Sequence, residues 1–343
     1  MALSSIFKLR QEATPALLEL LNNTTLGTNG AKYRHLDTTE RILEADNPLF
    51  LSMERTDKVI GNATFCQRDQ FWYIRYFAFH SFAQAGNKKK KTDKGNSFLK
   101  RELNLFFDEV FEGKYSDKPI ESMYAYIDPR NDRSKWMSEN FGFKVIGQLA
   151  TQSYSRVYPK VSTRLEIITD WELLKPLVEK EYSEHAYFFT THAQKGPFYA
   201  LKDKDGAIIA FTRVTKVNWE IVRLPGKVGG LLTKIIPFIP FLNKLIKPKN
   251  HTFLVPEIVV IKDNNPTLLN ELFSGILAAE KLNLLLWWID KQDPLYTSIK
   301  DKIKWGFFNK LIGVNPVDVV ERRNPTSKAI SKGPVFVTAF DLV

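Results

Sequence analysis

The sequence has little of several features that define other classes of protein. Among its 343 residues there is one cysteine, Cys66, so an internal disulfide and a metal cluster built on cysteines are excluded. No apolar run reaches the roughly 18 residues that a transmembrane helix needs. The first ten residues lack the basic and apolar regions of a secretory signal. We therefore expect a protein of the reducing cytoplasm.

Familiar catalytic motifs are also missing. There is no Walker A loop, no Gly-x-Gly-x-x-Gly and no Gly-x-Ser-x-Gly. The five histidines are scattered without a His-Glu-x-x-His spacing, so we expect no metal. His185 and His192, near Glu181 and Glu184, could share one helix face, and a solvated helix is the simplest explanation of that group.

Positive charge, in contrast, is abundant. The net charge is +11, spread over the whole chain, with two local clusters at 86–101 and 223–250. Such clusters can bind phosphorylated ligands or anionic membranes, or they can be loops exposed to solvent. Nucleic acid is disfavoured, because aromatic residues do not interleave the lysines of 88–91.

Two segments have the pattern of a β-hairpin. In 48–67 and again in 198–215, two apolar runs flank a short polar turn, and the second turn holds Asp205-Gly206. A long run of aromatic and β-branched residues follows each hairpin, at 71–79 and at 252–261. The two hairpins therefore begin what resembles an internal repeat.

The elements that follow keep the same order in both halves. Apolar residues recur at helical spacing over 98–110 and over 268–277. Further along, an apolar strand ends at Asp128 in one half and at Asp290 in the other, and a short helix is expected after each. Phe141-Gly142-Phe143 is then echoed by Trp305-Gly306-Phe307.

This order predicts a duplicated α/β architecture. We expect closing strands at 144–149 and 152–158 in the first half and at 335–342 in the second. The halves would be domains 1–160 and 161–343, joined near Pro159-Lys160. Strands and helices mixed in this order favour an α+β mixed sheet with helices on both faces.

The segment from Asn131 to Phe143 resembles the last motif of the GCN5-related N-acetyltransferase (GNAT) superfamily. In that motif an Asn opens a helix, a small residue follows at +3, a Tyr at +7 and Gly-Phe at +11 and +12. Asn131, Ser134, Gly142 and Phe143 match, whereas Ser138 stands at the Tyr position. The resemblance implies a tandem duplicated GNAT-like acyl-CoA N-acyltransferase fold. Its C-terminal lobe is a degenerate copy, because Lys262–Pro266 stands where a glycine-rich turn belongs.

Upstream, Thr92–Leu99 stands where the family has a glycine-rich turn, and Gly95 matches it. A turn that opens a helix offers backbone N–H groups to a pyrophosphate, and Gly95 allows a positive φ. The resemblance therefore implies acetyl-CoA or another acyl-CoA as co-substrate of the N-terminal lobe. The implied cofactor-binding residues are Phe79, Lys94, Gly95, Asn96, Ser97 and Asn131.

The implied reaction is direct attack of an amine on the thioester. The amine must lose a proton and the departing thiolate must gain one. His80, at the end of the strand 71–79, is our candidate base, and Glu54 is the alternative. Ser138 replaces the usual acid, and its hydroxyl can form a hydrogen bond or place a water. Other hydroxyls that could serve as the acid are those of Tyr124, Tyr126 and Tyr154.

The segment 226–250 is an apolar and basic insert. Pro237 and Pro240 interrupt it, so it cannot be one continuous helix. We keep three interpretations: a lid or interdomain cover, a contact with a membrane surface or lipid substrate, and a dimer contact.

Two classes of function follow from these residues. The first is an enzyme that moves an acyl group, with acetyl expected, from acyl-CoA to an amine that the sequence does not identify. The second is a binding or scaffold protein that kept the fold and lost the chemistry, as the departures at Thr92 and Ser138 suggest. A long-chain or lipid-related N-acyltransferase is a variant of the first, favoured by the insert.

Overall fold

The fold is described from a computed structural model, and the residues it describes are 5–27, 31–45, 47–56, 58–79, 98–194, 196–224, 226–327 and 333–342. The chain divides into two compact units. Unit 1 comprises Met1–Leu26, Asp37–Ile146 and Val319–Ala329, and unit 2 comprises Gly27–Leu36, Gly147–Asp318 and Ile330–Val343. Each unit therefore takes segments from both of the expected halves. The domain boundary at residue 160 stays a prediction.

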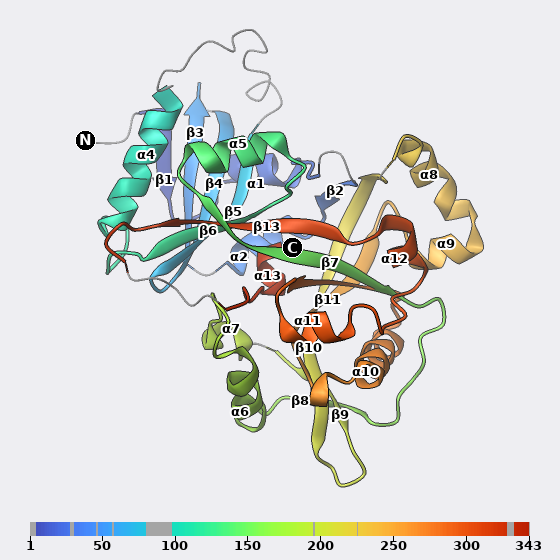
Figure 1. Cartoon of the computed structure of the whole chain (residues 1–343). Helices are drawn as coiled ribbons and strands as arrows, with labels where there is room; N and C mark the ends of the chain where they lie inside the picture. The colour runs from blue at the N-terminus through green and yellow to red at the C-terminus, as the bar shows by residue number, and fades with distance from the viewer. Residues whose placement is uncertain are drawn as a thin grey trace. The chain divides into compact units, whose positions relative to one another are not determined.

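Unit 1 is a sheet with helices on both faces (Figure 1). Its strands lie in the order β1-β3-β4-β5-β6, antiparallel except for the parallel pair β5 and β6. The bounds are β1 Phe7–Arg10, α1 Pro15–Asn22, α2 Thr38–Leu43, β3 Pro48–Arg55, β4 Lys58–Arg68, β5 Phe71–Phe79, α4 Phe98–Phe111, β6 Ser122–Ile127 and α5 Asp132–Asn140.

Unit 2 repeats this plan. Its strands lie in the order β7-β12-β11-β10-β9-β8, with β2 paired to β10. Only β11 and β12 are parallel among these pairs. The strands are β2 Lys32–His35, β7 Lys144–Ser155, β8 Leu165–Ile168, β9 Phe198–Lys202, β10 Ile208–Arg223, β11 His251–Ile261, β12 Leu284–Asp290 and β13 Asn315–Arg323. Strands β7 and β13 each have residues in both units.

The helical elements of unit 2 include short and long ones. They are α6 Trp171–Tyr182, α7 Thr190–Ala193, α8 Gly229–Ile235, η1 Ile236–Phe238, α9 Pro240–Leu245, η2 Lys262–Asn264, α10 Pro266–Ala279, α11 Pro294–Ile299, α12 Phe307–Ile312 and α13 Ala339–Leu342. The insert 226–250 is thus α8, η1 and α9 rather than one continuous helix, as expected; Pro237 lies within η1, and the helical backbone is broken at Ile239, just before Pro240.

Local sequence explains where several helices begin. In α1, α10 and α11 a polar side chain caps the helix and a proline occupies the first helical position. Asn265 accepts a hydrogen bond from the Thr267 N–H at 2.9 Å, and Asp293 accepts one from the Leu295 N–H at 2.7 Å. These caps satisfy N–H groups that a helix leaves without partners.

Each sheet buries apolar residues on both faces. In unit 1, α4 covers one face, with Phe106 and Val110 packed against Phe65 and Trp72. The other face packs against α1 and α2 through Leu17, Leu20, Leu21 and Ile42. In unit 2 the two faces are covered by α10 with α11 and by α6 with the segment around Phe336. The expected mixed sheet with helices on both faces is confirmed.

The closing strand expected at 335–342 is wrong. Val335 forms only an isolated bridge with Ala186, and α13 follows. The last strand of the described chain is β13. The sequence pattern did not predict it, because Pro316, Asp318 and Glu321 interrupt the run of apolar residues. The structure buries both carboxylates beside donors: the Gln148 side chain donates to Asp318 at 2.6 Å, and Arg323 donates to Glu321 at 2.8 Å.

Two further expectations need adjustment. The strands expected at 144–149 and 152–158 are one strand, β7. The echo of Phe141-Gly142-Phe143 in Trp305-Gly306-Phe307 extends only to the positive φ of the two glycines, +78° at Gly142 and +105° at Gly306, because Gly142 follows the end of α5 and leads into β7 whereas Gly306 caps the start of α12. Each is a left-handed position at which glycine is favoured. Across the described residues, no helix combines the length and apolarity required to span a membrane.

Candidate functional site

The parallel strands β5 and β6 of unit 1 separate after a short stretch of pairing. Their register runs from Phe71 opposite Ser122 to Tyr73 opposite Tyr124. Strand β5 continues to Phe79 and β6 to Ile127, without further pairing between them over this described backbone. Strand edges that part in this way present N–H and C=O groups to a partner other than the neighbouring strand.

A β-bulge lies in β5 at the point of separation. Phe65 pairs with Ile74 and Ala63 pairs with Phe77, so Thr64 alone stands opposite Arg75 and Tyr76. The extra residue reverses the alternation of the strand. Trp72 and Ile74 consequently belong to the core under α4, whereas Tyr76 and Ala78 belong to the core under α1.

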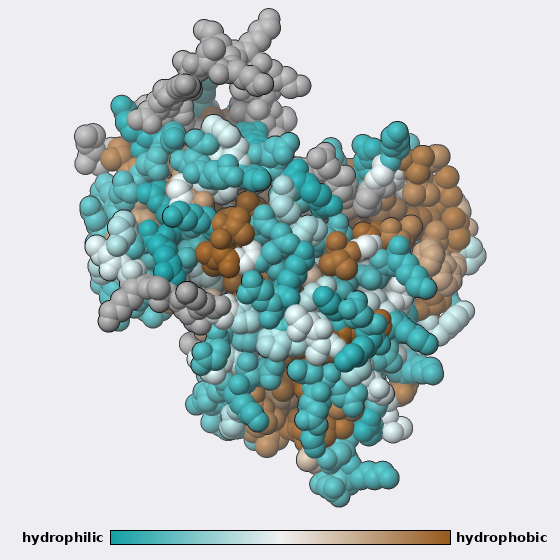
Figure 2. Space-filling model, viewed as in Figure 1, coloured by the Kyte–Doolittle hydropathy of each residue, from teal (hydrophilic) through white to brown (hydrophobic). Residues whose placement is uncertain are grey.

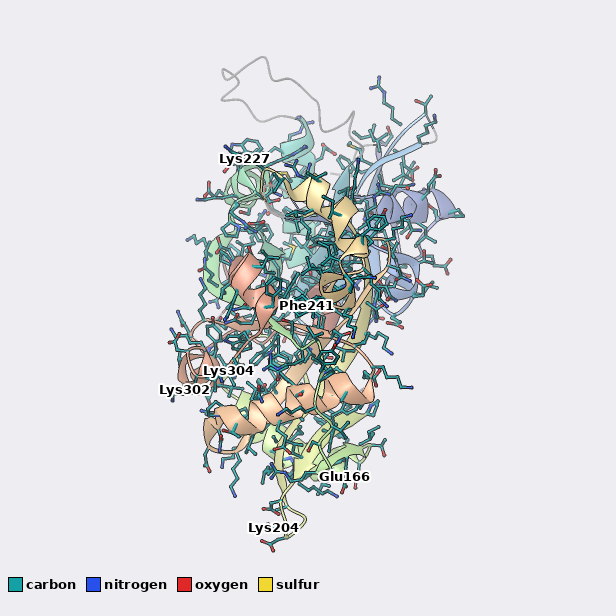
Figure 3. The ribbon with its side chains drawn as sticks, turned by 90° about the vertical axis from the view of Figure 1, so that its right-hand side faces the viewer. Glu166, Lys204, Lys227, Phe241, Lys302 and Lys304 are labelled. Atoms are coloured by element: carbon teal, nitrogen blue, oxygen red, sulfur yellow. The ribbon has the colours of Figure 1, made fainter. Side chains whose placement is uncertain are left out.

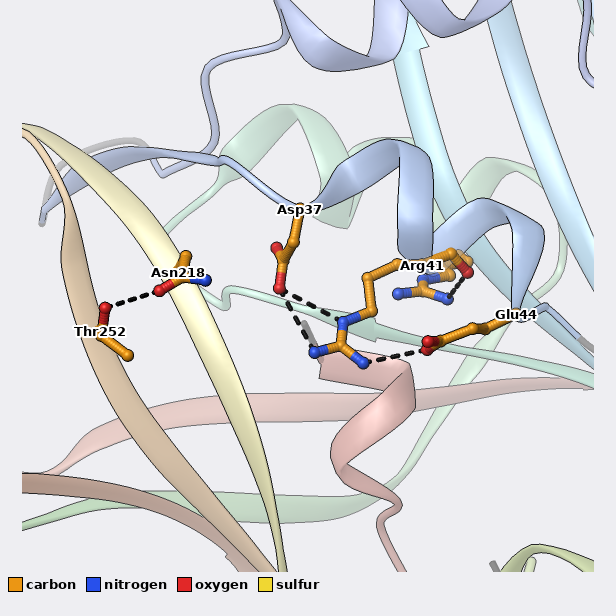
Figure 4. Close-up of polar contacts among 6 residues, drawn as sticks. Asp37, Arg41, Glu44, Asn218 and Thr252 are labelled. Carbon is orange, nitrogen blue, oxygen red and sulfur yellow. Dashed lines mark hydrogen bonds and ion pairs between the residues drawn. The ribbon is translucent and has the colours of Figure 1, made fainter. Parts of the chain in front are cut away.

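Contacts from α2 hold the bulge in place. The Arg75 guanidinium donates to the Arg41 carbonyl at 3.4 Å and lies over the Tyr76 ring, 4.8 Å from its centroid. The Arg41 side chain is itself fixed by Asp37 at 3.3 Å and Glu44 at 3.0 Å (Figure 4). Burial raises the pKa of Tyr76, so its hydroxyl stays protonated at neutral pH.

Beyond the bulge, the face of β4 and β5 under α4 is hollowed. The hollow is shallow and partly open to solvent, and it is lined by Phe7, Leu51, Met53, Gly61, Asn62, Ala63, Phe77 and Leu103. Gly61 and Ala63 leave space where β4 carries small side chains. Phe77, which is 40% exposed, stands at the opening rather than in a packed core. The lining is almost wholly apolar.

Two helices meet over this end of the sheet. Lys100, in the first turn of α4, donates to the Asn140 side chain at the end of α5, at 3.4 Å. The first turn of α4 has no acidic residue and includes Lys100 and Arg101. Arg101 forms an ion pair with Glu102 at 3.6 Å, so this helix start attracts anions mainly through its N–H groups, its dipole and the Lys100 side chain.

The structure places three of the expected site residues near this end of unit 1. Asn131 caps α5, and its side-chain oxygen accepts the Ser134 N–H at 3.2 Å. Ser138, on α5, donates its hydroxyl to the Lys135 carbonyl at 2.8 Å. Glu54 follows Met53, which stands in one row with Gly61 and Phe79, so Glu54 lies at the edge where β5 ends.

The environment of Glu54 limits its use as a base. Arg10 donates to the Glu54 carboxylate at 2.5 Å, and the side chain is 20% exposed. The ion pair compensates the negative charge of Glu54 and holds its carboxylate toward β1. Its role as the alternative base stays a prediction.

The other residues that we expected in the site are described by their backbone alone or lie outside the described residues. His80, Lys94, Gly95, Asn96 and Ser97 lie outside the described residues. Phe79 is described by its backbone, which pairs with Gly61. The base and the turn that would bind pyrophosphate therefore stay predictions from the sequence.

The alternative tyrosines lie in different surroundings. Tyr124 is fully buried and accepts a hydrogen bond from Arg68 at 2.8 Å. The ring of Tyr126 is tilted against that of Tyr73, with ring centroids 5.4 Å apart. Tyr154 belongs to unit 2, donates to Asn270, and burial raises its pKa to about 12. Tyr154 is thus part of the core of unit 2.

Unit 2 contains the same two backbone features. Its parallel strands β11 and β12 pair at Leu254 opposite Leu285. Strand β11 also carries a bulge, because Thr212 alone stands opposite Ile258 and Val259. Ile258 has φ +53°, which is a strained conformation for a β-branched residue. A threonine, Thr64 or Thr212, faces the bulge in each unit.

In unit 2 the segment 333–342 forms hydrogen bonds with residues of these two parallel strands. The Val335 N–H donates to Asp290 at the end of β12, at 3.0 Å. The Ala339 N–H donates to Glu257 of β11, at 2.9 Å, and Arg213 holds the other oxygen of that carboxylate. Residues 335–339 are all buried. Segment 333–342 thus contacts both of the strands that part.

The turn after β11 lacks the glycine that a turn binding an anion would use. Asp263 and Asn264 take left-handed φ values of +55° and +48° without a glycine. Asn265 then caps α10 with its own side chain. Lys262 offsets the charge of Asp263 in this turn, but the Asn265 side chain already takes an N–H group that a phosphate would need.

Another finding in unit 2 corrects an expectation. His185 is not on a solvated helix: its side chain is 6% exposed, and its Nε2 lies 3.0 Å from Asp293. The side chain of His192 lies outside the description. Among the described residues, no group of three or more His, Cys, Asp or Glu could hold a metal ion.

Comparisons with known proteins settle the fold. The sequence matches no protein-family model and no curated protein. Its structure is similar to a GCN5-related N-acetyltransferase from Sphaerobacter thermophilus, with TM-score 0.52 and 10% identity over 96% of this chain and 100% of that one. It is also similar to a tandem GNAT protein from the clavulanic acid biosynthesis pathway, with TM-score 0.52 and 11% identity over 94% and 100%.

This chain has the tandem GNAT fold. A third similar structure is Saccharomyces cerevisiae N-myristoyltransferase with bound myristoyl-CoA, with TM-score 0.57 and 11% identity over 98% of this chain and 90% of that one. At these identities the likeness establishes the fold alone. Sequence reasoning reached the GNAT fold through Asn131–Phe143. It missed the bulge and the hollow, because every residue from Phe71 to Phe79 except Arg75 and Ala78 is aromatic or aliphatic and bulky.

Proposed function

We propose that this chain transfers an acyl group from acyl-CoA to an amine, and that unit 1 binds the acyl-CoA. The observation that carries the proposal is the separation of β5 from β6 beside the bulge at Arg75 and Tyr76. Parted parallel strands can pair with the amides of a pantetheine arm. The α4 start, with Lys100 and Arg101 and without acidic residues, suits a pyrophosphate.

Unit 2 is the less suitable place for the same ligand. Asp263 lies at the turn before α10, and Asn265 occupies the cap. The segment 333–342 is bound to Asp290 and Glu257 of the strands that part. A cofactor would have to displace these buried hydrogen bonds, each of which is worth roughly 1.5–3 kcal/mol when it involves a charged group.

In the proposed reaction the amine nitrogen attacks the thioester carbonyl. The C–N bond forms, the C–S bond breaks, and a proton passes from the amine to a base and finally to the thiolate. A backbone amide of β5 beyond its last pair with β6 would polarise the carbonyl. His80 is our proposed base and Glu54 the alternative. We propose acetyl as the acyl group, because the hollow beside Ala63 and Phe77 is shallow.

One observation favours a second candidate, a GNAT-fold binding protein without catalysis. The Ser138 hydroxyl, at the position of the usual acid, donates to the Lys135 carbonyl. In that arrangement it does not offer its proton to a leaving thiolate. A thiolate leaves without much protonation, so we keep the enzyme as the main proposal. The binding protein is the outcome that binding without turnover would establish.

Isothermal titration with acetyl-CoA, CoA and a long-chain acyl-CoA tests the proposal. We expect micromolar binding of acetyl-CoA. Gly95→Trp should abolish it, because a large side chain would block the turn before α4. The matched control is Asn264→Trp, at the corresponding turn of unit 2, which should leave binding unchanged.

Three results would lead to other conclusions. Loss of binding only in Asn264→Trp would move the site to unit 2. A clear preference for the long chain would replace a short acyl group with a lipid-like one. Binding of acetyl-CoA without release of free thiol in the presence of a panel of primary amines would favour the binding protein.

A further inference from the structure

Unit 2 has an apolar patch on its surface that the proposed reaction does not use. The patch consists of large side chains from α8, η1, α9 and α12 that are exposed to solvent, namely Val228, Leu231, Ile235, Phe238, Phe241, Phe307 and Leu311. Figure 2 shows hydrophobic residues gathered over α8 and α9. Phe238 is 83% exposed, Leu231 is 59% exposed and Leu311 is 53% exposed. Contiguous exposure on this scale marks an interaction site.

Other residues of the same segment fix it to unit 2. Ile236, Leu245 and Ile246 are buried. At Gly229 a Cβ atom would lie 1.8 Å from the Leu224 carbonyl oxygen, so only glycine allows this close approach. One set of apolar side chains therefore packs the segment against unit 2. The apolar patch is a second set, which is exposed to solvent.

The patch continues from α9 to α12. The rings of Phe241 and Phe307 pack edge to face, with centroids 5.5 Å apart, although each is more than 40% exposed. Figure 3 looks onto this side of the molecule, with Phe241 between α9 and α12. Tyr158, 78% exposed, extends the surface: Lys244 donates to its hydroxyl at 3.4 Å.

Charge of one sign accompanies the patch. Segment 223–250 has six basic residues and no acidic one. Lys227, Lys234, Lys247 and Lys249 are exposed, and none of them forms an ion pair with a described acidic residue. Figure 3 labels Lys227 near the start of α8 and Lys304 before α12. The patch is therefore apolar with a basic surround.

We propose that this patch docks on the surface of a bilayer that contains anionic phospholipid. The aromatic and aliphatic side chains would enter the boundary between headgroups and acyl chains. The lysines would reach lipid phosphates while their stems stay on the apolar surface. A second copy of this chain suits the patch less well, because symmetric contact would bring lysine against lysine.

Co-sedimentation of the full chain with vesicles tests this docking. We expect binding to vesicles of phosphatidylcholine with about 30% phosphatidylserine, and much weaker binding to phosphatidylcholine alone. Leu231→Ser with Phe238→Ser should reduce the partition coefficient about tenfold or more, because it removes the side chains that enter the boundary. Lys234→Glu with Lys244→Glu should reduce it similarly, and added salt should mimic that charge variant.

Matched controls come from elsewhere on unit 2. Ile167→Ser removes an apolar side chain that is 61% exposed, and Lys204→Glu, in the hairpin turn labelled in Figure 3, reverses an exposed charge. Both should bind vesicles like the unaltered chain. Absence of binding, or equal loss in patch and control variants, would overturn the proposal. So would a concentration-dependent dimer, seen by analytical ultracentrifugation, that Phe238→Ser alone dissociates.

Discussion

Single residues distinguish the two units where a strand passes into a helix. The first turn of α4 holds Lys100 and Arg101, whereas the first turn of α10 holds no charged residue and is capped by the side chain of Asn265. The two helices are otherwise alike in length and in the apolar face they bury. A lysine in the first turn favours an anion at the α4 start over the α10 start.

A buried histidine in unit 2 gives a prediction about pH. Burial, with the nearby Lys247, lowers the pKa of His251 from 6.5 to about 4. Between these values the unfolded chain binds a proton that the folded chain does not. The free energy of unfolding should therefore fall by about 3 kcal/mol as the pH drops from 6.5 to 4.

His251→Gln should reduce that dependence on pH, because glutamine does not titrate. The measurement is urea unfolding of both proteins at several pH values. Asp290, whose pKa is raised by burial, contributes equally to both and cancels in the difference. The same slope in the two proteins would mean that His251 is accessible to protons in the folded state.

At the level of elements, the bulges organise both units. Each inserts one residue opposite a threonine, in the strand that then parts from its parallel neighbour. The insertion moves the following side chains to the other face of the sheet. In unit 1 this places Phe77 beside its partner Ala63 in the hollow, and in unit 2 it places Val259 and Ile261 under α10. The repeated bulge is a sign of duplication that sequence identity no longer carries.

The hollow between β4 and α4 gives a prediction at this scale. Ala63→Leu should fill the space beside Phe77 and Leu103. If the acyl group lies there, affinity for acetyl-CoA should fall about tenfold, whereas affinity for CoA should be unchanged. Isothermal titration of both ligands measures the ratio.

A residue on the opposite face of the sheet supplies the control. Ala78 is buried under α1, so Ala78→Val should lower stability without altering the ratio of the two affinities. Equal loss of both ligands in Ala63→Leu would show that the acyl group lies elsewhere.

At the level of the whole molecule, each unit depends on distant parts of the chain. Val320, from β13, is 2% exposed within the core of unit 1. Arg322 donates to Asn104 at 3.0 Å and to Asp108 at 2.8 Å. The Asn324 N–H donates to the Glu121 carbonyl at 2.8 Å. Unit 1 is therefore completed by residues encoded almost at the end of the sequence.

This dependence predicts the behaviour of a fragment. Residues 1–160 alone should be less stable than unit 1 in the full chain by about 2 kcal/mol or more, since the fragment lacks Val320 and the contacts of Arg322. A synthetic peptide of 315–329 should raise the urea midpoint of the fragment. The same peptide with Val320→Asp should not. A fragment as stable as the full chain would support the simple boundary at residue 160.

The sequence by itself determined the kinds of elements and their order. Turn residues, caps such as Asn265-Pro266 and apolar spacing act locally, so the hairpins, α4, α10 and the interruption of the insert 226–250 could be predicted. The tertiary structure alone decided which segments complete each unit, where the bulges fall, and that β13 rather than 335–342 forms a strand. These features depend on contacts between residues far apart in the sequence. The hydrogen bond from Gln148 to Asp318, for example, compensates the cost of burying a carboxylate. A local sequence pattern does not contain this information.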